Sequence, residues 1–130
     1  MKKESIKVYI QPAKFSPLGY VVEVEQQREL AKKIASGEVV SHDSPEEQWD
    51  LHTYLNLYLF EHATPVDNAN IPEHHYGTIV YETKSGGIIQ IDNSLGWSEI
   101  SCDKKGSLYL ENLLREKGYS VITTKEAITG

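Results

Sequence analysis

Alternation of apolar and polar residues predicts two strands near the start of the chain. Residues 5–10 and residues 19–25 each place every second side chain on an apolar face, and this period of two is typical of a half-buried strand. Between them, residues 11–17 contain two prolines and predict a loop, because proline removes a donor from a strand ladder. The inward positions are expected to be Ile6, Val8 and Ile10 in the first strand and Tyr20, Val22 and Val24 in the second.

The clearest helix in the sequence is expected to begin at Ser44 and to reach about His62. Ser44 has the chemistry of an N-cap, Pro45 fits the first helical position, and Glu47 completes a capping box. The acidic first turn also complements the helix dipole.

This helix is apolar on two opposite faces. A helix of that kind is normally buried on both sides. We therefore expect either that a sheet and another helix enclose it, which is the commoner arrangement, or that Trp49 and Phe60 are left for a partner. At 100° per residue, the first face holds Leu51, Tyr54, Leu55, Tyr58 and His62, and the second holds Trp49, Thr53, Asn56 and Phe60, flanked by Leu57 and Leu59.

Hairpin-linked strands and separated helices predict an α+β fold. Residues 63–75 are expected to form a long loop, and residues 103–106 are expected to end the strand at 97–102 before the last helix begins at Ser107. The order β β α α β β β α β gives one domain over residues 1–130, with helices packed on an antiparallel sheet of four to six strands. The other expected elements are helices at 26–36 and 107–117, each ended by a glycine, and strands at 76–83, 88–91, 97–102 and 119–123.

Charge is distributed very unevenly along the chain. Residues 38–83 hold nine acidic residues, all five histidines and no Lys or Arg, whereas the remainder holds all 13 Lys and Arg and ten acidic residues. The net charge of −6 argues against binding of nucleic acid, which depends on neutralising phosphates, and favours a basic protein partner. The candidate partner-binding residues of this acidic block are Asp43, Glu46, Glu47, Trp49, Asp50, Phe60, Asp67 and Glu73.

The expected absence of a signal peptide and the single cysteine favour a location in the cytoplasm. No apolar stretch follows the charged residues at the start, so we expect no signal peptide. The longest apolar run, residues 51–60, is too short to span a bilayer, so no membrane contact is expected. Cys102 is the only cysteine, which excludes an intramolecular disulfide.

The histidines do not have the spacing of a metal site. His52 and His62 would lie about 80° apart around the helix and roughly 15 Å apart along it, too far to bind one ion. No H-E-x-x-H or C-x-x-C motif is present, and we expect neither a metal nor another cofactor.

Catalytic chemistry is equally weakly indicated. Glu73, His74 and His75 supply residue types for general base catalysis, but no nucleophile accompanies them. Cys102 falls in a predicted strand and is expected to be a buried thiol. The Ser85-Gly86-Gly87 run precedes a strand rather than a helix, so it predicts a hairpin turn and not a phosphate loop. We therefore expect no catalytic residues.

A small, acidic α+β domain of this kind resembles the immunity proteins of bacterial polymorphic toxins and of contact-dependent growth inhibition. The resemblance rests on the acidic block at residues 38–83 and on the run Gly77-Thr78-Ile79-Val80-Tyr81 with Gly87-Ile88-Ile89-Gln90-Ile91-Asp92. It implies a non-enzymatic inhibitor that covers the active site of a secreted, nuclease-type toxin, often a basic protein. Two other hypotheses are a phage or accessory regulator that binds another protein, and a hydrolase that uses His and a carboxylate.

Overall fold

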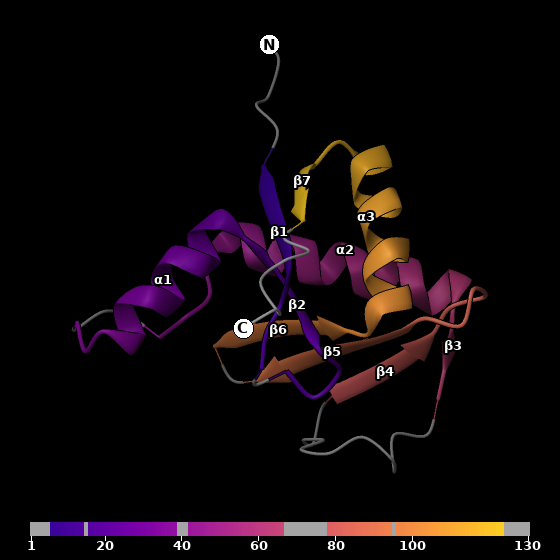
Figure 1. Cartoon of the computed structure of the whole chain (residues 1–130), viewed down its shortest axis with the longest axis horizontal. Helices are drawn as coiled ribbons and strands as arrows, with labels where there is room; N and C mark the ends of the chain where they lie inside the picture. Colours follow the sequence, from indigo (N-terminus) through magenta and orange to yellow (C-terminus); the bar gives the residue numbers. More distant parts are fainter. Residues whose placement is uncertain (1–5, 15, 39–41, 67–77, 95, 124–130) are drawn as a thin grey trace.

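A strongly twisted sheet forms the centre of the molecule in the computed structural model, which describes residues 6–14, 16–38, 42–66, 78–94 and 96–123 (Figure 1). Helices α2 and α3 pack on one face of the sheet, and α1 follows β2 directly and lies beside it. The elements are β1 (Lys7–Pro12), β2 (Tyr20–Val24), α1 (Glu25–Ala35), α2 (Glu46–His62), β3 (Thr64–Pro65), β4 (Thr78–Glu82), β5 (Ile88–Ser94), β6 (Trp97–Cys102), α3 (Lys104–Lys117) and β7 (Ser120–Thr123).

The sheet has the spatial order β3-β4-β5-β6-β2-β1-β7. All neighbouring strands are antiparallel except β1 and β7, which are parallel. The predicted α+β class with a mostly antiparallel sheet is confirmed, and within the described residues the sheet has seven strands rather than four to six. The additional strand is β3, where Thr64 and Pro65 pair with Glu82 and Tyr81 at the start of the predicted loop.

The hydrophobic core lies between the sheet and the two helices. Strand residues on one face meet the leucines of α2 and α3, and the predicted inward positions Val8, Ile10, Val22 and Val24 are all buried. Leu55 is fully buried, as its place on the first helix face predicts. The helix residues of this core are Leu51, Leu55, Leu59, Leu110, Leu113 and Leu114.

The start of α2 differs from the predicted capping box. Pro45 occupies the N-cap position, and no side chain caps the helix. Ser44 instead binds the sheet, because its Oγ accepts from Ser98 N at 2.9 Å and its backbone N donates to Gly96 O at 2.7 Å. The serine therefore anchors the helix start to β6, a long-range role that local spacing does not reveal.

The start of α3 also differs from the prediction. Residues 103–106 do end the strand, because β6 stops at Cys102, but the helix begins at Lys104 rather than Ser107. Asp103 is the N-cap, and its Oδ1 accepts from Gly106 N at 2.7 Å. The same oxygen accepts from Ile88 N at 3.0 Å and so ties the helix start to β5. The predicted helix stops are confirmed, because Gly37 and Gly118 both have positive φ, at 87° and 113°.

Candidate functional site

The solvent side of α2 carries a continuous stripe of exposed residues, which we call the α2 stripe. Its members fall within about 100° of the helix circumference. Leu57 is 66% exposed and Phe60 is 72% exposed, the largest values among the large apolar residues that the structure describes. The α2 stripe consists of Glu46, Asp50, Thr53, Leu57, Phe60 and Glu61.

This exposure overturns the expectation that α2 is enclosed on both sides. Phe60 is not covered by a second layer in the described structure, so enclosure on both sides is wrong, and the use of Trp49 and Phe60 by a partner stays a prediction. Leu59, expected beside Phe60, is instead fully buried. Trp49 is half-buried and turns its ring towards His52, with ring centroids 5.3 Å apart.

The structure brings together three of the candidate partner-binding residues. Glu46, Asp50 and Phe60 share the α2 stripe, whereas Glu47 and Trp49 lie half-buried at its two margins. Asp43 precedes the helix, and its carboxylate lies beside Gly96 in the turn after β5. Asp67 and Glu73 lie outside the described residues. Leu57 and Glu61 also belong to the stripe but were not among the residues predicted from the sequence. The signal was available, because at 100° per residue both lie on the same side of the helix as Glu46.

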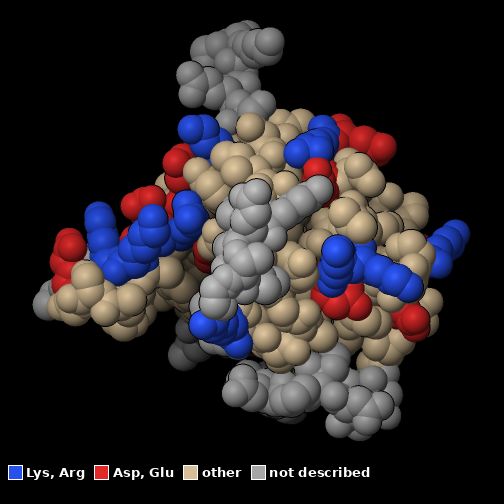
Figure 2. All heavy atoms as spheres, viewed as in Figure 1, with Lys and Arg blue, Asp and Glu red and all other residues tan. Residues whose placement is uncertain are grey.

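Charge on the α2 stripe is of one sign. Its charged members are all acidic, because residues 38–83 contain no Lys or Arg. Basic side chains come from other elements: Figure 2 shows Lys and Arg over α1 and over other parts of the viewed face, and Lys117 Nζ of α3 lies 4.8 Å from the ring centroid of Tyr54, beside the stripe. The stripe therefore combines apolar exposure with a local negative field.

The buried side of α2 carries a polar network around His52. His52 Nδ1 lies 2.8 Å from Ser98 Oγ, and Nε2 lies 3.0 Å from Asn56 Nδ2. Tyr81 Oη donates to Asn56 Oδ1 at 3.4 Å. Burial lowers the pKa of His52, although the charge of Asp92 acts in the opposite direction.

The orientation of the Asn56 amide, with Nδ2 towards the ring, implies one tautomer of His52. An amide nitrogen only donates, so Nε2 accepts from Asn56 and the proton is on Nδ1, which donates to Ser98. His52 is then no base for the Ser98 hydroxyl, which is itself fully buried. The network serves to hold α2 against β6.

Metal ligands are not clustered in the described part of the chain. Within it, no three His, Cys, Asp or Glu side chains are placed to hold one ion. His74 and His75, considered above with Glu73, lie outside the described residues. The thiol of Cys102 is buried, and burial raises its pKa well above the usual range, as does the nearby charge of Asp103.

Two buried glutamines fill a gap between β2 and β6, and no sequence signal indicated them. The two strands pair only as far as Val22, and beyond it they separate. Gln48 enters the gap, where its Oε1 accepts from Val24 N at 2.9 Å and its Nε2 lies 3.5 Å from the carbonyl oxygens of Val22 and Ser98. Gln27 adds a bond from Nε2 to Ser98 O at 3.3 Å. The side chains thus replace the missing strand pairing.

Comparisons of this chain with protein families, with curated proteins and with solved structures find no match. Of the helices that the structure describes, none is both long enough and apolar enough to cross a bilayer. The function of this chain is therefore inferred from the geometry of the site.

Proposed function

We propose that this chain is a cytoplasmic, non-enzymatic inhibitor of the immunity type, which binds a basic, nuclease-type toxin through the α2 stripe. The observation that supports this most directly is the exposure of Leu57 and Phe60, one helical turn apart, among side chains whose charges are all acidic. Exposed apolar residues within a charged rim are typical of surfaces that recognise proteins of opposite charge.

The two kinds of residue have different tasks in this proposal. The carboxylates of Glu46, Asp50 and Glu61 attract a cationic protein and raise the association rate, which salt then screens. Leu57 and Phe60 lose their exposure on binding and slow dissociation.

The α2 stripe supplies the centre of an interface rather than all of it. From Glu46 to Glu61 the helix extends about 22 Å, and a helix with its side chains is about 10 Å wide. That footprint is far below the roughly 800 Å² per partner of a standard interface. The partner must also cover neighbouring surface, and the exposed strand β3, which follows α2 directly, is the nearest such element along the chain.

The role of the apolar residues Leu57 and Phe60 is tested by replacing both with aspartate. Capture from a host lysate identifies the partner, and Leu57→Asp with Phe60→Asp is expected to weaken its binding at least 30-fold, as about 2 kcal/mol or more at a hot spot implies. Leu108→Asp on α3 is the matched control, because Leu108 is also an exposed leucine, at 48%. A double variant that binds like wild type contradicts the proposal.

The charged half is tested by association kinetics across a salt series. Glu46→Lys with Asp50→Lys is expected to slow association and flatten its salt dependence. Glu29→Lys with Glu38→Lys makes the same charge change at exposed positions on α1 and just after it, and is expected to change both much less. Inhibition of the partner's nuclease activity at one-to-one stoichiometry supports the immunity role. A partner that binds through the stripe without losing any activity favours the regulator hypothesis instead.

A further inference from the structure

Four of the chain's eight tyrosines lie together where α2 meets α3. We call them the tyrosine cluster: Tyr54 and Tyr58 on α2, Tyr109 on α3 and Tyr119 just before β7. The ring centroids of Tyr54 and Tyr58 lie 6.0 Å apart, and the side chain of Tyr109 hydrogen-bonds that of Tyr58. All four rings pack against the core but stay half-buried, so part of each meets solvent.

The tyrosine cluster adjoins the α2 stripe. Tyr54 follows the stripe residue Asp50 by one helical turn and lies only about 40° further around the helix. Burial is the main cause that raises the pKa of Tyr54 and of Tyr119, and negative charge adds to it, from Glu116 at Tyr54 and from Asp50 at Tyr119. The aromatic rings therefore lie in a negative field that continues the field of the stripe.

The ring of Tyr54 already holds a cation. Lys117 is the last residue of α3, and its Nζ lies over that ring, 4.8 Å from the centroid. Within about 6 Å, the quadrupole of an aromatic ring attracts a positive charge. Lys117 is exposed, and no carboxylate in the described part of the chain forms an ion pair with it. Because its ammonium is strongly hydrated and its stem is flexible, Lys117 is easily displaced into water.

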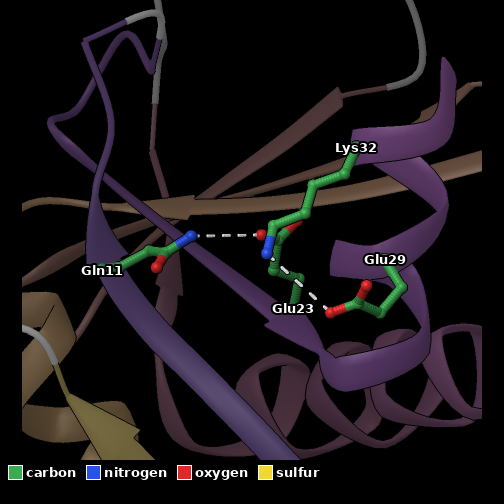
Figure 3. A network of polar contacts seen from close by, with 4 residues as sticks. All are labelled: Gln11, Glu23, Glu29 and Lys32. Carbon is green, nitrogen blue, oxygen red and sulfur yellow. Dashed lines mark hydrogen bonds and ion pairs between the residues drawn. The ribbon is translucent and has the colours of Figure 1, made fainter. Parts of the chain in front are cut away.

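A second ring that holds a cation lies on the other face of the sheet. Arg28 Cζ is 4.4 Å from the ring centroid of Tyr9, whose two neighbours along β1 point into the core, so Tyr9 points away from α2. Beside it on α1, Lys32 bonds Glu29 at 3.8 Å (Figure 3). This second ring is remote from the α2 stripe and provides matched controls.

We propose that the basic partner places one of its own cationic side chains over Tyr54 in place of Lys117, so that the tyrosine cluster forms the second part of the interface. This inference rests on the proposed function, because the α2 stripe holds the same partner. The stripe alone is smaller than a standard interface, and the cluster extends it towards α3. Tyrosine is also among the residues that most often dominate binding energy.

The ring of Tyr54 is tested by calorimetric titration of the captured partner into full-length variants. Tyr54→Leu keeps an apolar contact with the core but removes the aromatic face, and it is expected to weaken binding about tenfold. Tyr54→Phe keeps that face and is expected to weaken binding less than about threefold. Tyr9→Leu, which removes the other ring that holds a cation, leaves the affinity unchanged. Tyr54→Leu binding within about twofold of wild type overturns the proposal, as does an equal loss in Tyr54→Phe.

The displacement of Lys117 is tested separately, because this exposed side chain can be changed without disturbing the core. Lys117→Gln is expected to strengthen binding about threefold more than Lys32→Gln, which makes the same charge change on α1. In NMR spectra, the ring current of Tyr54 is expected to shift the ε-methylene protons of Lys117 upfield, and saturation with partner should return them to the position of a solvated lysine. An unchanged signal at saturation contradicts displacement.

The variants of the α2 stripe separate the failure of this inference from that of the proposed function. If Leu57→Asp with Phe60→Asp abolishes binding and Tyr54→Leu does not weaken it, only the role of the tyrosine cluster is wrong. If the stripe variants bind like wild type, the proposed function is wrong, and the second part of the interface falls with it.

Discussion

Replacing Gln48 by methionine tests the claim that side chains substitute for strand pairing between β2 and β6. Methionine fills nearly the same space but cannot hydrogen-bond, so the buried Val24 N–H loses its acceptor at 2.9 Å. An unpaired buried donor costs about 1–3 kcal/mol. The two 3.5 Å contacts add little, since Ser98 O keeps its bond from Gln27. We expect a loss of about 1–3 kcal/mol in the free energy of unfolding, out of a total of about 5–15 kcal/mol.

Urea unfolding followed by circular dichroism measures this loss. With a slope of about 2 kcal/mol/M, the midpoint is expected to fall by about 0.5–1.5 M without a change in slope. Gln26→Met is the matched control, because Gln26 is exposed on α1 and its replacement is expected to move the midpoint very little. Hydrogen exchange adds a local readout, since the Val24 amide should exchange faster in Gln48→Met. A loss below about 0.5 kcal/mol together with unchanged Val24 exchange would refute the reasoning.

Three further predictions follow from burial. Leu55→Ala is expected to cost about 2–5 kcal/mol of stability and Phe60→Ala less than about 1 kcal/mol, and equal losses in denaturant titrations would contradict the assigned faces of α2. Because the pKa of His52 is lowered from 6.5 in the folded state, its contribution to stability is complete above about pH 6.5 and declines as the pH falls below that value. The free energy of unfolding measured against pH should therefore fall less steeply in His52→Gln than in wild type, and identical profiles would contradict this. Cys102 is expected to resist a thiol reagent in the folded protein and to react after unfolding, so rapid labelling without denaturant would show that the thiol is accessible.

Elements defined by local periodicity could be predicted from the sequence. The alternation around Val8 and Val22 gave the correct strands and the correct buried face, and Gly118 correctly ended α3. These features depend on residues that are close together in the sequence, and a sequence pattern records such local relationships. Strand β3 was missed because two residues carry no periodicity, and only pairing with β4 defines them.

The site was predicted less completely than the fold, because tertiary contacts decide what its residues do. Ser44 has the chemistry of a cap, yet its hydroxyl is used by β6. Gln27 and Gln48 are polar residues in helices, and pattern alone places such residues towards solvent, although both are almost fully buried. The solvent exposure of Phe60 likewise depends on the absence of a second layer over α2 in the described structure, which no local pattern encodes.

The parallel pairing of β1 with β7 has a consequence for the order of folding. Lys7 lies opposite Ser120, so this ladder closes a span of roughly 110 residues, at an entropic cost of about 4 kcal/mol before any contact repays it. The α3–β7 segment is local by comparison, because Tyr119 N bonds Leu114 O. During synthesis, one edge of β1 therefore stays unpaired until β7 has left the ribosome. A circular permutant opened between α1 and α2, where no pair of hairpin strands is cut, would convert this longest contact into a short-range one and should fold faster.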